Sequence, residues 1–219
     1  MKIRRYKRVK ASMEFYKKNF GFRAPYNVLI DGTFCFEAKE KKVKIREQLP
    51  NYLRSELNIV TTQCCIIEVE NLLRLKKSLS GCCQILKQFA VHRCGHEGQP
   101  LTSTSCIMSM LDKGNPHRYI VASNDPSLRN LIRHTYCGVP QIFMVGVAPT
   151  LEKISPNTLK KVEKESNVLI SEREVERLKE MKATLSITMK KSDLKKNKKK
   201  KKRKFKAEDV PSSSSLETS

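Results

Sequence analysis

Cysteine and histidine side chains lie close together in one polar stretch of the sequence. One residue separates Cys94 from His96, and nine residues separate His96 from Cys106. Thiolate sulfur and imidazole nitrogen are ligands that bind tetrahedral zinc in proteins. The spacing therefore predicts a zinc site that needs a fourth ligand, although buried free thiols also fit the pattern. The candidates for the fourth ligand are Cys64, Cys65, Cys83 and His92.

Two short apolar segments each end in an aspartate, Asp31 after residues 26–30 and Asp125 after residues 118–124. The carboxyl ends of strands in an open α/β sheet line its functional crevice. Glu68 or Glu70 could join the aspartates there and bind a divalent metal ion, which activates water for phosphodiester hydrolysis. The alternative is that both aspartates begin helices, as Asp125 followed by proline is well suited to do.

Alternating strands and helices must position these side chains. Helical periodicity occupies the segments between the short apolar runs, and this alternation is typical of an α/β fold with a parallel sheet. The expected strands are residues 26–31, 58–64, 118–125 and 139–146. The expected helices include residues 40–57, broken near Pro50, and residues 65–79, 81–92, 126–136 and 157–182.

The charge of the chain points to a polyanionic partner. Its 219 residues include 44 Lys or Arg and 22 Asp or Glu, for a net charge of +22. This charge favours nucleic acid or an acidic membrane surface as the ligand. No run approaches the roughly 18 apolar residues of a membrane span, and no secretory signal is evident. We therefore expect a soluble protein of a reducing compartment, with its eight cysteines free.

Much of the positive charge lies in two terminal arms. Residues 1–24 contain nine Lys or Arg and one Glu, and their apolar residues recur at steps of three or four up to Gly21. This pattern predicts a basic helix that is docked by its apolar face. Its outward cations are expected either to contact phosphates or simply to be solvated.

The second arm, residues 190–206, contains twelve Lys or Arg and one Asp, and a serine-rich end follows it. Such a block repels itself and has little to bury, so we expect disorder over residues 190–219. It could serve as a nuclear import signal, contact RNA, or be a solvated tail. The predicted regions are a basic arm at 1–24, a domain at 25–150, a helical extension at 151–189 and the tail at 190–219.

Five ordered motifs resemble the PIN-domain proteins of the eukaryotic small-subunit processome, most closely the family called U three protein twenty-three. The motifs are FRAPYNVLIDGTF, TTQCCIIEVE, RCGH with TSTSC, HRYIVASNDPSLR and GVPQIFM. The resemblance covers about residues 1–150. It implies a PIN fold, which is a three-layer α/β/α sandwich on a parallel sheet, with a CCHC zinc finger inserted in it. It also implies that Cys64 is the fourth ligand beside Cys94, His96 and Cys106, so that a structural zinc staples the insertion to the sheet.

The resemblance further implies a nucleolar factor of early 18S rRNA maturation. Its expected partners are pre-rRNA, an H/ACA small nucleolar RNA and other processome proteins, with no membrane role. The expected RNA-binding residues are Arg4, Arg5, Lys7, Arg8, Lys17 and Lys18 in the first arm and Lys198, Lys199, Lys200, Lys201, Lys202, Arg203 and Lys204 in the second.

A competent PIN nuclease resembles this sequence at Asp31, Glu68 and Asp125, but it usually has another acid just before the position of Cys106. Residues 103–105 are Ser-Thr-Ser here. We therefore expect a vestigial acidic site and no enzyme activity. The alternative is an active metal-dependent endoribonuclease that uses the three remaining acids. A generic basic scaffold bound through its tail alone is disfavoured, because the specific motifs lie in the structured part.

Overall fold

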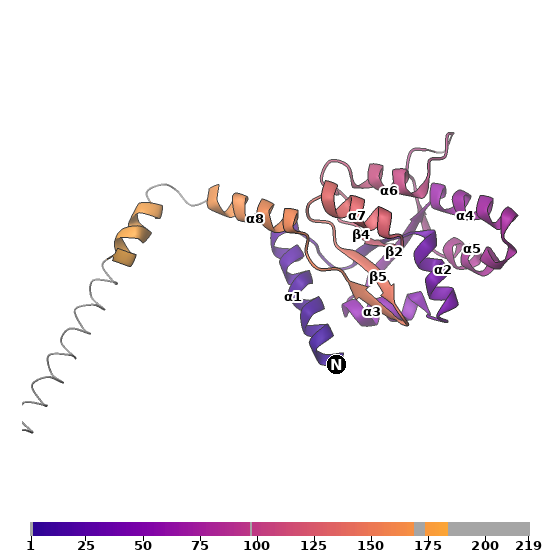
Figure 1. Cartoon of the computed structure of the whole chain (residues 1–219), viewed down its shortest axis with the longest axis horizontal. Coiled ribbons are helices and arrows are strands. Elements are labelled where there is room, and N and C mark those ends of the chain that lie inside the picture. Colours follow the sequence, from indigo (N-terminus) through magenta and orange to yellow (C-terminus); the bar gives the residue numbers. More distant parts are fainter. Residues whose placement is uncertain (1, 97, 169–173, 184–219) are drawn as a thin grey trace, which may run out of the picture. The chain divides into compact units, whose positions relative to one another are not determined.

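The computed structural model describes residues 2–96, 98–168 and 174–183 (Figure 1). The chain divides into two units, residues 1–164 and 165–219. Residues 174–183 of the second unit are helical, and the predicted tail at 190–219 lies outside the described residues. The predicted boundaries after residues 24, 150 and 189 stay predictions. Within the described part of the chain, no helix is both long enough and apolar enough to cross a membrane.

The first unit is built on a six-stranded sheet with the order β3-β2-β1-β4-β5-β6. The first five strands are parallel and β6 pairs with β5 in the antiparallel direction. The strands are β1 (Tyr26–Ile30), β2 (Leu57–Thr62), β3 (Ala90–His92), β4 (Ile120–Ala122), β5 (Gln141–Val145) and β6 (Ala148–Leu151). The predicted α/β class with a parallel sheet is confirmed, and β3 and β6 are additions to it.

Helices cover both faces of this sheet. They are α1 (Lys2–Phe20), α2 (Gly32–Glu40), α3 (Ile45–Leu53), α4 (Gln63–Leu75), the 3-10 turn η1 (Lys77–Leu79), α5 (Ser80–Lys87), α6 (Ser103–Leu111), α7 (Pro126–Thr135) and α8 (Pro156–Val168). Right-handed connections place α2 to α5 on one face and α6 and α7 on the other. Figure 1 shows α6 and α7 together on one side of the strands and α3 on the opposite side. The predicted three-layer α/β/α sandwich is confirmed.

Two local predictions were wrong. The helix predicted over residues 40–57 is shorter, because only Ile45–Leu53 form a helix, α3, and Pro50 lies inside α3 instead of breaking it. A proline inside a helix removes one backbone hydrogen bond, and α3 ends three residues later, at Leu53, so little of the helix is lost. The helix predicted over residues 81–92 ends at Lys87, and Ala90–His92 pair with β2 as a strand.

Short polar side chains begin the helices that follow the strands. Asp31, Thr62 and Asp125 are the N-caps of α2, α4 and α7, and each accepts a hydrogen bond from a backbone N–H of its own helix. Such caps satisfy N–H groups that otherwise have no partner at a helix start. The carboxyl edge of the sheet is therefore lined by helix starts held by polar side chains.

The basic first helix docks by its apolar face, as predicted. Val9, Met13 and Tyr16 are at most 4% exposed and belong to the main core. The Phe20 backbone carbonyl accepts a hydrogen bond from Arg118, just before β4, and the Phe20 ring packs on Gly138, just before β5. Helix α1 therefore runs along the amino-terminal edge of the sheet, opposite to the helix starts.

Candidate metal centre and acidic crevice

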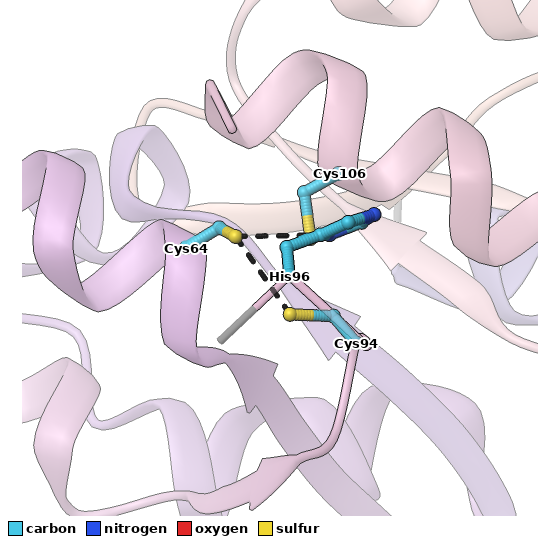
Figure 2. A group of neighbouring side chains, drawn as sticks. All are labelled: Cys64, Cys94, His96 and Cys106. Carbon is cyan, nitrogen blue, oxygen red and sulfur yellow. Dashed lines mark hydrogen bonds between the residues drawn. The ribbon is translucent and has the colours of Figure 1, made fainter. Parts of the chain in front are cut away.

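Four potential metal ligands from three parts of the fold meet at the carboxyl edge (Figure 2). Cys64 lies in the first turn of α4, Cys94 and His96 lie in the loop after β3, and Cys106 lies in α6. Their ligand atoms all lie within 4.8 Å of one another. The three residues that the spacing singled out are thus brought together with Cys64, and the other fourth-ligand candidates are outside the group.

The distances in this cluster suit a tetrahedral ion. The Sγ atom of Cys64 lies 3.7 Å from Sγ of Cys94 and 3.8 Å from Nδ1 of His96. A zinc ion with bonds of about 2.3 Å to sulfur and about 2.0 Å to nitrogen separates its ligand atoms by roughly 3.5–3.8 Å. In the described residues this is the one group of three or more clustered Cys, His, Asp or Glu side chains that could hold a metal ion. The donor set is the one that zinc prefers.

A serine orients the histidine of the cluster. Nε2 of His96 lies 3.5 Å from Oγ of Ser109, and that hydroxyl donates to the carbonyl of Cys106 at 2.7 Å. In the tautomer that leaves Nδ1 of His96 free to bind a cation beside the thiols, the Nε2–H group donates a hydrogen bond to Oγ of Ser109. The sequence interpretation missed Ser109, although it lies three residues after Cys106 on the same helix face.

The thiols differ in how readily they ionise. Burial raises the pKa of Cys64 and of Cys106. Burial also acts on Cys94, but hydrogen bonds from the His96 backbone and from the neighbouring thiols outweigh it, and the pKa of Cys94 falls from 9.0 to about 7. Clustered thiolates repel one another, so a divalent cation supplies the charge that lets all of them bind as anions.

The acidic crevice lies at the same edge of the sheet. A cavity of about 330 Å³ is lined by Asp31, Glu68 and, in addition to the predicted acids, Glu37. Ser103 lines it too, at the position where the sequence lacks an acid. Asp125 does not line this cavity, so the structure brings together only two of the three predicted carboxylates there.

Each of the three predicted carboxylates accepts hydrogen bonds from its own chain. Asp31 accepts from the backbone N–H of Gly32 and from the hydroxyls of Thr33 and Ser123 at 2.6–2.9 Å. Burial raises the pKa of Asp31, although these hydrogen bonds oppose the increase. This carboxyl group is thus held in place as a structural acceptor.

The other two predicted acids are engaged in the same way. Glu68 accepts from the backbone N–H of Ser103, at the start of α6. Asp125 accepts from the N–H groups of Ser127 and Leu128, at the start of α7. Both alternatives in the sequence interpretation therefore apply in part, because Asp31 caps a helix and lines the crevice, whereas Asp125 only caps a helix.

Most of the predicted RNA-binding residues of α1 lie on its surface. Lys7, Arg8, Lys17 and Lys18 are exposed, and none of them lies within ion-pair distance of a described carboxylate. Arg5 is half-buried, and its guanidinium lies 5.3 Å from the Tyr52 ring centre, so it contributes to packing. The Arg4 side chain and residues 198–204 lie outside what the structure describes.

Known proteins resemble a large part of this chain. The family model Fcf1 matches residues 51–153. The rRNA-processing protein utp23 of Schizosaccharomyces pombe is 35% identical over 161 residues, which are 73% of this chain and 60% of that protein. The rRNA-processing protein FCF1 of Saccharomyces cerevisiae is 30% identical over 147 residues, which are 66% of this chain and 73% of that protein.

A solved structure, that of the PIN domain endonuclease Utp24, has the same architecture. It superposes with a TM-score of 0.50 and 25% sequence identity, and covers 60% of this chain and 94% of that one. The sheet, the helical layers and the sequence matches agree with the family that the motifs predicted. This chain belongs to the Fcf1 and Utp23 family of PIN-domain rRNA-processing proteins.

Proposed function

We propose that this protein is an RNA-binding assembly factor that acts in the nucleolus, in early 18S pre-rRNA processing, and that its PIN fold does not cleave RNA. Its ligands would be pre-rRNA and an H/ACA small nucleolar RNA, beside other processome proteins. The observation that carries this proposal is a difference between the acids of the crevice and the cations of α1. Asp31 and Glu68 of the crevice accept hydrogen bonds from their own chain, whereas Lys7, Arg8, Lys17 and Lys18 of α1 have no described acidic partner within ion-pair distance.

Catalysis by such a crevice would need a metal ion beside the scissile phosphate. Mg²⁺ requires several oxygen ligands in near-octahedral geometry and loses its water reluctantly. Asp125 is turned to the start of α7, and Ser103 contributes no charge. Both oxygens of Asp31 already accept hydrogen bonds from their own chain. These features favour a crevice that retains the form of a nuclease site without its activity.

The cluster of three thiols and one imidazole would hold a structural zinc ion. Cys64, Cys94, His96 and Cys106 complete a tetrahedron and leave no open position for water or substrate, as is typical of structural sites. When bound, the ion supplies folding free energy. It would connect the long loop after β3 to the starts of α4 and α6.

The exposed cations would contact phosphates. Lys7, Arg8, Lys17 and Lys18 project from a helix that the core holds in place, so their positions are fixed by the fold. Each phosphate contact releases condensed counterions, and affinity for single strands then falls with salt at a logarithmic slope of about −0.7 per contact. Residues 198–204 would add further contacts of the same kind.

The test is an assay of binding and cleavage on the full chain with a labelled single-stranded RNA, with and without Mn²⁺. We expect binding without cleavage by the wild type. Lys17→Gln together with Lys18→Gln should weaken binding and flatten its salt dependence, and Asp31→Asn should leave binding unchanged. Absence of RNA binding by the wild type would refute the proposal.

The second candidate function is metal-dependent endoribonuclease activity. It is favoured by the shared cavity of Asp31, Glu37 and Glu68 and by the likeness to the PIN domain endonuclease Utp24. The same assay separates the two functions. Cleavage in Mn²⁺ by the wild type that is lost in both Asp31→Asn and Glu68→Gln would establish the nuclease.

A further inference from the structure

Two cavities lie at the amino-terminal edge of the sheet. The first has a volume of about 650 Å³, and the residues of its wall include Tyr6, Lys7, Lys10, Lys17, Tyr26 and Arg54. The second has a volume of about 330 Å³ and is lined by Gly21, Arg23, Pro25, Asn27, His117 and Arg118. Tyr26 lines the first cavity, and its sequence neighbours Pro25 and Asn27 line the second. We call them together the amino-edge groove.

This groove is separate from both sites described above. Tyr26 begins β1, Arg54 precedes β2 and Arg118 precedes β4. These strands are parallel, so the groove lies at the opposite edge from Asp31 and from Cys64, which follow strand ends. A ligand in the groove would leave the crevice and the metal cluster unoccupied.

The groove is strongly basic. The cations Lys7, Lys10, Lys17 and Arg54 line the first cavity, and the one acid among its described lining residues, Glu14, lies 3.9 Å from Lys10. Arg23 and Arg118 line the second cavity, which contains no acid among its lining residues. The charge of each cavity therefore complements an anion, and the two cavities share the amino-terminal edge of the sheet.

Aromatic rings lie beneath two of these cations. The guanidinium carbon of Arg54 lies 4.6 Å from the centre of the Tyr6 ring, and Nζ of Lys17 lies 5.9 Å from the centre of the Tyr26 ring. A planar guanidinium that rests on an aromatic ring has a second face on which a flat group can stack. Unpaired RNA bases stack on such arginine planes and on aromatic side chains.

The backbone at Arg54 strengthens this interpretation. Arg54 ends α3 with φ +53°, in the left-handed conformation, and Arg118 has φ +51°. Glycine adopts this conformation at the least cost and is the usual residue at such helix ends. In each cavity an arginine thus occupies a backbone position where stability alone favours glycine.

We propose that the amino-edge groove binds an unpaired segment of RNA. A base stacks on the outer face of the Arg54 guanidinium, and phosphates contact Lys10 and Lys17 and then, further along, Arg23. An unpaired segment fits better than a duplex, because a base must leave its own stack to reach the arginine plane. The inference rests on the RNA binding proposed above and assigns that binding to a named groove.

The test uses three variants of the full chain and a fluorescent single-stranded RNA of mixed sequence. Arg54→Gly removes the stacking plane at a position that suits glycine, so the fold should keep its melting temperature. Lys42→Gly is the matched control, since Lys42 is also an exposed cation, has φ +54° and lines neither cavity. Arg54→Lys keeps the charge but lacks the plane.

We expect Arg54→Gly to bind the RNA about tenfold more weakly, a loss typical of one stacked base. Lys42→Gly should stay within about twofold of the wild type, and Arg54→Lys should recover little of the loss. Equal affinities of Arg54→Gly and Lys42→Gly would overturn the inference while leaving the proposed RNA binding intact. An equal loss of duplex RNA binding in Arg54→Gly, or displacement of the RNA by an oligoglutamate peptide of equal charge, would also overturn it. A wild type that binds no RNA would refute the proposed function itself.

Discussion

The two edges of the sheet use their polar groups in opposite ways. At the carboxyl edge, acids and hydroxyls hold helix starts and one another, and the thiols and imidazole face a common centre. At the amino edge, cations line open cavities with a single acid among them. Open α/β sheets usually bind ligands at the carboxyl edge. Here the cation-lined cavities lie at the other edge, so the proposed ligand surface is away from the acidic crevice.

The largest expected effect comes from removing a metal ligand at the carboxyl edge. Cys106→Ser should lose the bound zinc and at least about 5 kcal/mol of stability, because zinc binding contributes to folding directly. For a domain of this size that corresponds to a fall of the melting temperature on the order of 10 °C or more. Calorimetry and elemental analysis of the purified protein measure both quantities.

Cys137→Ser makes the same chemical exchange at a half-buried thiol outside the cluster and should keep the metal. Equal melting temperatures of Cys106→Ser and Cys137→Ser, or a wild type that contained no zinc, would rule out the metal centre.

The Gly138→Ala substitution should destabilise the docking of α1 at the amino edge and leave the metal cluster unchanged. A Cβ atom there would lie 2.2 Å from the Phe20 ring, and the backbone has φ +78°. Overpacking and the left-handed conformation together should cost about 3 kcal/mol. Hydrogen exchange should increase in α1, while the zinc content stays at that of the wild type.

Gly114→Ala separates the cost of overpacking from the cost of the left-handed backbone, because Gly114 has φ +81° and nothing lies within 4 Å of its Cβ position. It should cost only about 1–2 kcal/mol, the penalty of the backbone conformation. Equal losses of stability in the two variants would show that Phe20 does not anchor α1.

Sequence patterns predicted the central strands and the loop that contains Cys94 and His96, but they did not predict the two edge strands. Apolar runs predicted β1, β4 and β5, which are the buried strands. β3 has only three residues, directly after a helical segment, and exists as a strand because β2 pairs with it. β6 has only four residues and contains Pro149. Both missed strands lie at the edges of the sheet, where the sequence signal is weak.

The candidate sites show the same division. Cys94, His96 and Cys106 follow from their spacing, but Cys64 is far away in sequence and came from the family resemblance. Arg54 and Arg118 were missed because each is an isolated arginine in its own segment. They meet α1 only through the fold, so a search for runs of like charge does not find them.

Asp125→Ala tests whether this acid serves the helix start rather than an RNA site. The alanine removes both hydrogen bonds to the first turn of α7, and loss of such a cap costs about 1 kcal/mol. Asp125→Asn keeps one acceptor oxygen and should lose only a few tenths of a kcal/mol. Chemical denaturation measures the stability, and RNA affinity should be unchanged in both variants. A loss of affinity in both would place an RNA contact at the carboxyl edge.

The smallest expected change in folding stability comes from Asp31→Asn, and this change depends on pH. Burial raises the pKa of this carboxyl group above 3.8, with a further increase from the charge of Glu68. Because the folded state holds the proton more tightly than the unfolded state, the stability that protonation contributes is fully present below pH 3.8 and is lost as pH rises through the folded pKa. The amide of the Asp31→Asn variant does not titrate, so the wild type should lose stability relative to that variant over this interval.

The local geometry allows this substitution. The amide oxygen of Asn can accept from the N–H of Gly32, and its NH₂ group can donate to the hydroxyls of Thr33 and Ser123, which can rotate. Denaturation curves from acidic to neutral pH should therefore show the difference between Asp31→Asn and the wild type growing with pH and then levelling. Glu47→Gln, at an exposed acid of α3, controls for the loss of one negative charge. A difference that shrank as the pH rose would mean that the ionised carboxylate stabilises the fold, and the crevice would then be a site that favours negative charge.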